Sequence, residues 1–339
     1  MNGLKWQLIQ HLFHQVSTLI SIILNLLLIL LIAKRSPKVM RSYKYMLMGV
    51  SVFEIFYSSI EIFVSPIVHS VHTVVLVMIV VEDWPKELML LLTATYCGSF
   101  GCFLVMFAIL FAYRYYVATG SLRLKYFESW YVIIWVVIVL LCGGTWGAIG
   151  YFMYGPSKEV DEFIRSFLFN ELALYPENIT YVAPHFYLYG ENGEKIWNWS
   201  SINGMNGVTL ITSTTVFFIM YYGKKNYQFI KSLSKKNNLS EKAKSMQRQL
   251  FYALVIQTSI PFVLLQLPLT ILFVCAALNF HLGQWAGIDT FTISLFPVFD
   301  PLPTIFVVKT YRAAVLGCMT KCRVAPVSSK TSQIPHVTM

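Results

Sequence analysis

Seven long apolar segments recur along the chain, separated by polar connections that carry most of the charge. They span residues 12–33, 45–68, 88–113, 130–154, 205–222, 251–278 and 285–308. A helix needs about 20 mostly apolar residues to cross the roughly 30 Å hydrocarbon core of a membrane. No small-residue cleavage site follows the first segment, so we expect a span there rather than a signal peptide. The pattern predicts an all-α membrane protein, a seven-transmembrane helix bundle within residues 1–323.

A shorter apolar run, Val74–Val81, lies between the second and third segments. Its eight residues are too few to cross a bilayer alone. We expect this run to extend the second helix outward or to lie at the membrane interface.

The composition agrees with a membrane protein and excludes most other classes. Hydrophobic residues make up 56% of the 339 residues and charged residues only 12%, whereas a soluble domain carries about 25% charged residues. The net charge of +10 does not indicate nucleic-acid binding, which needs basic residues gathered on a water-facing groove. The cysteines and histidines show no metal-ligand spacing and no Gly-rich phosphate loop occurs, so we expect no metal, no cofactor and no enzymatic activity.

Basic residues gather in alternate connections. Of the 26 Lys and Arg residues, 21 follow the first, third, fifth or seventh segment. The positive-inside tendency therefore predicts an outside N-terminus and a cytoplasmic C-terminus. Two of the three glycosylation sequons, at Asn178 and Asn198, fall in a connection assigned to the outside, and the third, at Asn238, falls on the cytoplasmic side and should stay without sugar. The basic connection 223–249 is expected to contact the headgroups of membrane lipids.

The connection 155–204 is long and acidic. Its first part carries apolar residues at helical spacing over residues 160–175. Its second part places Glu191-Asn192-Gly193 between two aromatic-rich runs, which predicts a β-hairpin because Asn and Gly tolerate positive φ. We expect a structured second extracellular loop over the bundle, which either rests on the helix ends or gates ligand entry.

The chain changes character after the seventh segment. Residues 309–322 are amphipathic and predict a helix at the membrane surface. Cys318 and Cys322 lie on one face of that helix and are candidates for lipidation. Residues 324–339, rich in Ser, Pro and Thr, predict a disordered cytoplasmic tail.

Carboxylates inside the apolar segments are the first functional candidates, because ionisable groups are costly in hydrocarbon. Glu54 and Glu61 lie two turns apart on one face of the second segment, and the seventh contains Asp289 and Asp300. We expect Glu54 and Asp300 to share an interior polar pocket with Asn25 and to form a switch network. The alternative is that neighbouring Ser, Tyr and water simply satisfy them.

Several stretches carry a family resemblance. Arg114 follows Tyr113 at the inner end of the third segment, and Pro301 follows Asp300 in the seventh. The most specific stretches are Ser51–Tyr57 with Glu61, Met246–Phe251 running on to Gln257 and Pro261, and Phe296–Leu302. With these stretches, and in its loop lengths, the chain resembles G-protein-coupled receptors. More specifically, it is similar to nematode serpentine chemoreceptors of the Str class, the class that contains the diacetyl odorant receptor.

The chain departs from the broader rhodopsin-like group at three points. Tyr113 stands where many of those receptors have an acid, and Asp300–Thr304 lacks the tyrosine of the Asn-Pro-x-x-Tyr motif. The connection 155–204 contains no cysteine for the common disulfide to the third segment. The activation details of that group therefore transfer only loosely.

The resemblance implies a chemosensory, olfactory receptor in the plasma membrane, in the cilium of a sensory neuron. A small, volatile or apolar odorant-like molecule would bind below the outer loops, and a heterotrimeric G protein would dock on the cytoplasmic side as the sixth segment swings at its prolines. Candidate ligand contacts on the third, fifth, sixth and seventh segments are Tyr96, Cys97, Ser99, Thr209, Thr212, Gln266, Thr270, Asp289 and Thr292. Candidate switch and coupling residues are Glu54, Arg114, Asp300 and Pro301.

Two other classes stay open. A small-molecule transporter would show internal repeats with paired broken helices, and no repeat is visible in the sequence. A ligand-gated ion channel with seven spans, like the insect odorant receptors, would require an inside N-terminus, contrary to the charge pattern. Tagging the two termini separately discriminates the channel, and G-protein dependence of the response discriminates the transporter.

Overall fold

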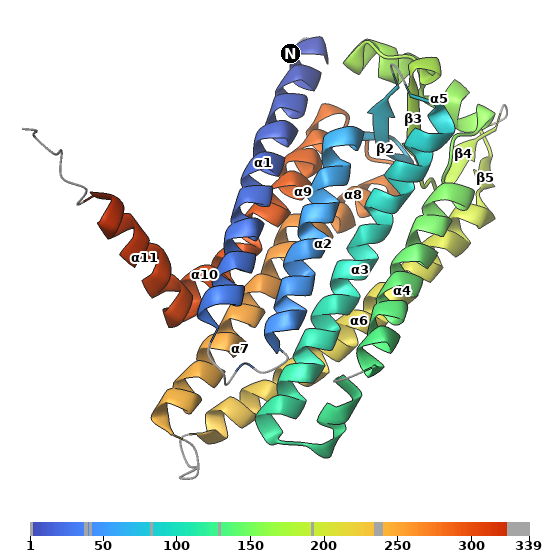
Figure 1. The fold of residues 1–339 in the computed structure, drawn as a ribbon. Coiled ribbons are helices and arrows are strands. Elements are labelled where there is room, and N and C mark those ends of the chain that lie inside the picture. The colour runs from blue at the N-terminus through green and yellow to red at the C-terminus, as the bar shows by residue number, and fades with distance from the viewer. Residues whose placement is uncertain are drawn as a thin grey trace, which may run out of the picture.

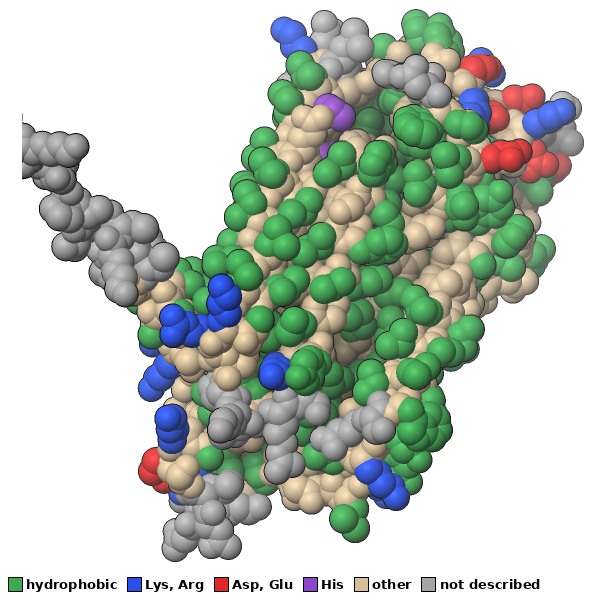
Figure 2. All heavy atoms as spheres, viewed as in Figure 1, with side chains coloured by type: hydrophobic (Ala, Val, Ile, Leu, Met, Phe, Trp, Pro, Cys, Tyr) green, Lys and Arg blue, Asp and Glu red, His purple; other side chains and the backbone are tan. Residues whose placement is uncertain are grey.

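The computed structural model describes residues 3–36, 40, 43–81, 84–127, 130–190, 193–233 and 240–323. Seven helices in it are long and apolar enough to cross a membrane, which confirms the predicted seven-helix bundle. They are α1 (Gly3–Arg35), α2 (Tyr43–Val64), α3 (Lys86–Thr119), α4 (Tyr131–Met153), α6 (Trp199–Ser232), α7–α8 (Glu241–Ala277) and α9–α10 (Gly287–Val307). Figure 1 shows them packed side by side, and Figure 2 shows hydrophobic side chains covering the sides while charges gather at the two ends.

Helix α3 lies at the centre of the bundle. In the most apolar 18-residue stretch of α3, 72% is buried. The corresponding share is 11% in both α4 and α6. Glycines let α4 approach it closely, because a Cβ at Gly143 would lie 2.1 Å from the Cys102 sulfur and one at Gly98 would lie 2.5 Å from the Gly143 carbonyl oxygen. Small residues at helix contacts are a common device in membranes, where close packing replaces the hydrophobic effect.

Prolines interrupt the last two spans. Helix α7 (Glu241–Pro261) continues through a π-helical turn (Phe262–Gln266) into α8 (Leu267–Ala277), with Pro261 and Pro268 on either side of the turn. Helix α9 (Gly287–Phe299) is followed by α10 (Pro301–Val307), with Asp300 at the junction. Proline lacks the backbone donor and clashes with the preceding turn, so the helix ladder is weakened at both places.

A layer that we call the cap covers one end of the bundle. It consists of β1 (Ile67–Val71), β2 (Val74–Val80), α5 (Lys158–Leu172), β3 (Ile179–Val182), β4 (Tyr187–Tyr189) and β5 (Lys195–Trp197), with short 3₁₀ turns such as Pro176–Asn178. Strands β1, β2 and β3 form one antiparallel sheet in that order. Helix α5 buries the predicted apolar stripe, and β4 pairs with β5, so the expected helix and hairpin are confirmed.

The expectation that Val74–Val81 extends the second helix was wrong. Residues 74–80 form β2, and α2 ends at Val64 rather than continuing to residue 68. Pro66 removes a backbone donor, and Ser65 adopts a positive φ of 37°, so the helix stops there. The run is rich in valine, which favours strands, and it is apolar throughout because both faces of β2 are largely buried.

Helix α11 (Lys309–Arg323) follows α10 and leaves the bundle at the end opposite the cap, as Figure 1 shows. A 3₁₀ turn, η2 (Leu122–Phe127), lies between α3 and α4 at the same end. The side chains of Cys318 and Cys322 and the whole of the predicted tail, 324–339, lie outside the described residues.

Candidate functional site

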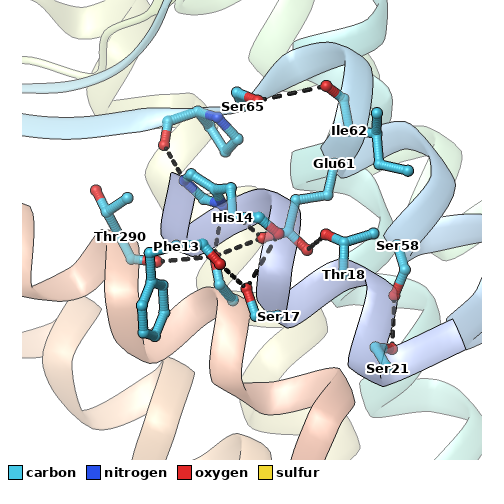
Figure 3. A network of polar contacts seen from close by, with 12 residues as sticks. Phe13, His14, Ser17, Thr18, Ser21, Ser58, Glu61, Ile62, Ser65 and Thr290 are labelled. Atoms are coloured by element: carbon cyan, nitrogen blue, oxygen red, sulfur yellow. Dashed lines mark hydrogen bonds and ion pairs between the residues drawn. The ribbon is translucent and has the colours of Figure 1, made fainter. Parts of the chain in front are cut away.

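An ion pair lies wholly inside the bundle near the cap, between α1 and α2. The His14 Nδ1 atom lies 2.8 Å from Glu61 Oε1, and the exposed fractions of the two side chains are 1% and 0%. The second ring nitrogen of His14 lies 3.0 Å from the carbonyl oxygen of Pro66. Because a carboxylate and a carbonyl oxygen only accept hydrogen bonds, this geometry suits a doubly protonated imidazolium. Figure 3 shows the two side chains turned toward each other.

Hydroxyl groups complete this cluster and connect it to α9. The Ser294 hydroxyl donates to Glu61 Oε1 at 2.6 Å, and the Thr18 hydroxyl lies 3.5 Å from Glu61 Oε2. One turn further along, Ser21 and Ser58 share a hydrogen bond of 2.8 Å between α1 and α2. We call His14, Thr18, Glu61 and Ser294 the upper cluster; it ties three helices together with every carboxylate oxygen in contact with a donor.

A second buried cluster lies nearer the middle of the bundle. Asp300 accepts a hydrogen bond from the Gln257 side chain of α7, and the Glu54 carboxyl lies beside both Asp300 and Asn25. The Asn25 amide donates to the carbonyl oxygens of Ser21 and Pro297, at 3.2 and 3.5 Å. The structure thus brings Glu54, Asp300 and Asn25 together and adds Gln257; we call these four the lower cluster.

The lower cluster is incompletely paired. Both oxygens of Glu54, Oδ1 of Asp300 and the side-chain oxygen of Asn25 are buried, and none of them makes a hydrogen bond of good geometry among the described residues. Two adjacent carboxyls in a dry interior cannot both ionise cheaply.

Aromatic side chains connect these clusters to a cavity below the cap. Tyr96 stacks on Tyr57 with ring centroids 4.8 Å apart, and Tyr57 packs edge-on against Phe103 and Phe296. The Asp300 backbone N–H donates to the Phe296 carbonyl oxygen at 3.0 Å. The chain of contacts therefore runs from Tyr96 to the lower cluster.

The cavity has a volume of about 90 Å³ and lies between the cap and the ends of α3, α4, α6, α8 and α9. Its walls are almost wholly apolar, and side chains such as Phe100, Trp146 and Phe273 line it. Tyr96 and Cys97 also line it. The Tyr96 hydroxyl is buried near that of Tyr57 and makes no hydrogen bond of good geometry among the described residues. A cavity of roughly 150 Å³ is enough to hold benzene, so this one suits a smaller molecule.

The other predicted ligand contacts do not line this cavity. Ser99 is buried and donates to the Thr95 carbonyl oxygen, while Thr270 donates to that of Gln266 and Thr292 to that of Asp289. Hydroxyls on helices commonly satisfy themselves this way, against the preceding turn. The residues that lie apart from the cavity are Ser99, Thr209, Thr212, Gln266, Thr270, Asp289 and Thr292.

Glu171 on α5 holds the cap to its neighbours. Its two oxygens lie 3.3 Å from the His69 Nε2 atom of β1 and 2.7 Å from the His281 Nε2 atom of the α8–α9 connection. The contact with His69 holds the pKa of Glu171 below its ordinary value. Gln7 of α1 donates to the Leu172 carbonyl oxygen at 2.6 Å, so α5 is also fastened to the bundle. Among the described residues, no group of three or more His, Cys, Asp or Glu is arranged to hold a metal ion.

Arg114 is buried at the opposite end, where it joins α3 to α7. Its guanidinium donates to the side-chain oxygen of Gln247 at 2.6 Å and to the Gln247 carbonyl oxygen at 3.2 Å. The Tyr43 ring lies 4.9 Å from the guanidinium carbon. The Gln247 amide and the Tyr43 ring thus contact Arg114 in place of a carboxylate that would form a salt bridge. Arg114 Nε has no hydrogen-bond partner among the described residues.

Sequence reasoning missed His14, Gln247, Gln257 and Ser294. His14 carried a usable signal, since an ionisable side chain inside an apolar segment is costly without a partner. The glutamines lie in a stretch that carries the family resemblance, but that stretch indicated no partner for them, and the serine carried no signal because uncharged polar residues are common in membrane helices. Their roles depend on which helices are neighbours.

Comparisons with known proteins place these features in a family. The model of the serpentine type 7TM GPCR chemoreceptor Str family matches residues 10–316. The chain is 33% identical over 313 residues to the G-protein coupled receptor str-217 of Caenorhabditis elegans, covering 91% of this chain and 89% of that protein. It is 26% identical to the serpentine receptor class r-10 of C. elegans over 99% of this chain and 100% of that protein. The receptor of the same name in C. briggsae is 27% identical over 88% of this chain and 87% of its own length.

Proposed function

The chain belongs to the Str family of serpentine seven-transmembrane chemoreceptors, and we propose that it detects a small apolar molecule and activates a heterotrimeric G protein. The cap would face outside and α11 the cytoplasm, as the distribution of basic residues favours. The proposed location is the plasma membrane of a sensory cilium.

The cavity below the cap is the proposed ligand site. Its apolar walls suit a small apolar ligand, and the Tyr96 hydroxyl offers one hydrogen bond. Pockets of this kind are mostly apolar, with a few polar groups that fix orientation. The cap forms one wall through Val75, Val77 and Val182, so entry would require it to shift.

The proposed coupling site is the end that carries Arg114. In the described arrangement the bonds from Arg114 to Gln247 hold α7 against α3. The π-helical turn after Pro261 loosens the helix ladder between this end and the cavity. A swing of α7 about that turn would separate Gln247 from Arg114 and open a cleft for the G protein.

The observation that carries this proposal is a continuous path of contacts from the cavity to the junction of α9 and α10. Tyr96 lines the cavity and stacks on Tyr57, Tyr57 contacts Phe296, and Phe296 accepts from the Asp300 backbone. A ligand can shift an equilibrium only by binding one state more tightly than the other. Contact with Tyr96 gives it a route to bias the junction of α9 and α10.

The test is a ligand panel applied to cells that express this chain with a G-protein reporter. Once a ligand is found, Arg114→Ala should abolish signalling while surface expression stays intact, and Lys125→Ala, at an exposed basic residue of η2, should signal like the wild type. Wild-type signalling from Arg114→Ala would remove that residue from the coupling site. A response that persists without any G protein would favour an ion channel or a transporter instead.

A further inference from the structure

A second cavity opens at the end opposite the cap, between α3, α4 and α6. It has a volume of about 400 Å³. The residues that α3 contributes include Val105, Ala108 and Ala112, where small side chains leave space, and aromatic walls come from Trp135 of α4 and Phe218 of α6. We call it the α4–α6 cleft. It lies apart from the proposed ligand cavity and shares no lining residue with it.

The length of the cleft matches one leaflet of a membrane. Its lining along α3 runs from Val105 to Tyr116, which is roughly 16 Å at 1.5 Å per residue. The hydrocarbon core of a bilayer is about 30 Å thick, so the cleft reaches about half-way through it. An acyl chain that enters beside Tyr116 would therefore lie along the cleft within a single leaflet.

The mouth of the cleft is polar and positively charged. Arg123 of η2 lines it, is exposed, and lies within hydrogen-bonding reach of the Tyr116 hydroxyl, a contact that raises the pKa of Arg123 above its ordinary value. The Tyr116 hydroxyl lies 2.9 Å from that of Tyr222 on α6. Guanidinium and hydroxyl donors arranged this way at a membrane surface suit a phosphate, which arginine binds through two parallel hydrogen bonds.

The turn that carries Arg123 is held by packing beneath it. The Trp135 indole N–H donates to the Tyr126 carbonyl oxygen at 2.7 Å, and the Phe127 ring stacks on Trp135 with centroids 4.8 Å apart. Both contacts hold η2 against α4. The charged mouth is therefore preformed, and binding need not first order a flexible loop.

A neighbouring cavity shows what distinguishes the α4–α6 cleft. It lies between α2, α3 and α4, has a volume of about 850 Å³, and has no charged residue in its lining. Nothing in that lining selects one lipid over another. The smaller cleft combines an apolar trough of leaflet depth with an arginine at its mouth.

We propose that the α4–α6 cleft binds an anionic phospholipid, with one acyl chain in the trough and the phosphate on Arg123. Basic pockets between membrane helices bind anionic headgroups in this way. The site is independent of the receptor function, because it requires only the packing of α3, α4, α6 and η2. A chain that fails to signal would still bind the lipid.

Native mass spectrometry of the full chain in detergent tests the headgroup part of the proposal. The protein is exposed to equal amounts of dioleoyl phosphatidylglycerol and dioleoyl phosphatidylcholine, and the ratio of retained lipids is measured. We expect wild type to prefer the phosphatidylglycerol and Arg123→Gln to lose roughly tenfold of that preference, as removal of a charge-assisted hydrogen bond predicts. Lys125→Gln, at a basic residue of the same turn that does not line the cleft, should retain most of it.

A second pair of variants tests the trough. Thr214 is an exposed residue of α6 that lines the cleft, and Leu210 is an exposed residue one turn nearer the cap that does not. Thr214→Trp should remove the tightly retained phosphatidylglycerol, whereas Leu210→Trp should keep it. An unchanged lipid ratio in Arg123→Gln overturns the proposal, as does equal retention by the two tryptophan variants. Displacement of phosphatidylglycerol by cholesterol, equally in wild type and Arg123→Gln, would make the cleft a sterol site and also overturn it.

Discussion

The upper and lower clusters stand on the same face of α2, two turns apart, and differ in how fully their polar atoms are paired. In the upper cluster, Glu61 accepts from Ser294 and Thr18 and forms an ion pair with His14. In the lower cluster, neither oxygen of Glu54 accepts a hydrogen bond of good geometry from the described residues, and Asp300 Oδ1 accepts none either. Both clusters are buried, with Glu54 and Glu61 at most 1% exposed.

We infer from this contrast that the upper cluster fastens the helices, and we propose that the lower cluster acts as a switch. A fully paired buried network loses hydrogen bonds in any other arrangement, so it holds α1, α2 and α9 in one geometry. An incompletely paired network carries a desolvation cost that another arrangement can relieve. The lower cluster also lies where α9 meets α10, directly before Pro301, so the backbone there can move.

The largest expected effect follows from removing the central carboxylate of the upper cluster. Glu61→Leu leaves His14 without its ion-pair partner and Ser294 without its acceptor. Breaking a buried pair costs about 3–5 kcal/mol, so surface expression should be nearly lost and the melting temperature of purified protein should fall by roughly 10 °C or more. Glu87→Leu, at an exposed acid in the first turn of α3, is the matched control. Near-normal expression of Glu61→Leu would show that the upper cluster does not hold the fold.

The next variant places an amide in the lower cluster. Glu54→Gln supplies a permanent donor to Asp300 and stabilises the described arrangement, so stability should stay at or above wild type. Activation must then break about one more hydrogen bond of the described arrangement. We therefore expect the ligand concentration for half-maximal response to rise roughly fivefold. Dose–response curves and thermal unfolding measure the two effects.

Glu61→Gln is the control, because it makes the same substitution two turns away in a paired network. It should lower stability, since the buried His14 loses its countercharge. If the two glutamine variants lose stability equally, the distinction between a fastening and a switch fails.

The same comparison shows how far the sequence alone reaches. Glu54 and Asp300 could be grouped in advance, because carboxylates in hydrocarbon need each other or another partner. The pairing of His14 with Glu61 could not, because it depends on which faces of α1 and α2 meet. The apolar cavity also has no signature in the sequence, because its walls are built from residues that would look the same facing lipid. Three of the polar residues chosen as ligand contacts, Ser99, Thr270 and Thr292, bond the backbone of their own helix instead.

The cap was predictable in its local parts and not in its assembly. The helical spacing in 160–172 and the Asn-Gly turn are local signals, and both correspond to observed elements. The sheet depends on β2 pairing with β3, with Val77 opposite Val182 across more than a hundred residues. A run that is buried on both faces shows no alternation, so the length of Val74–Val81 alone could not distinguish a strand from a helix extension.

A smaller effect is expected at the end opposite the cap, where Arg114 is also incompletely paired. Gln247→Ala removes both the side-chain acceptor and the packing that hold α7 to α3 in the described state. Hydrogen bonds to a charged group contribute about 1.5–3 kcal/mol, so ligand-independent signalling should rise roughly tenfold with the reporter assay. Lys242→Ala, at an exposed position on the same helix, should leave basal signalling unchanged. A lower basal signal in Gln247→Ala would mean that the contact supports the active state.

The smallest effect concerns the sequons at Asn178 and Asn198. One asparagine is exposed, and the side chain of the other is held by hydrogen bonds. Asn178 is exposed, whereas the Asn198 side chain caps α6 by accepting from the Ser201 N–H at 3.0 Å. Its Nδ2 atom, which would carry a glycan, lies 2.7 Å from Nε2 of the buried His185. Burial lowers the pKa of His185, so the ring stays neutral and Nε2 can accept from that amide. We therefore expect sugar at Asn178 and none at Asn198, provided the cap faces outside.

Gel mobility with and without a glycosidase measures this difference. Asn178→Gln should abolish the shift, while Asn198→Gln should keep it and lower stability by about 1 kcal/mol through loss of the helix cap. Asn198→Asp keeps the capping oxygen but has no amide, so it should recover most of that stability. A shift lost in Asn198→Gln and kept in Asn178→Gln would reverse the assignment. Absence of any shift in the wild type would instead contradict the outside location of the cap, on which the proposed direction of signalling depends.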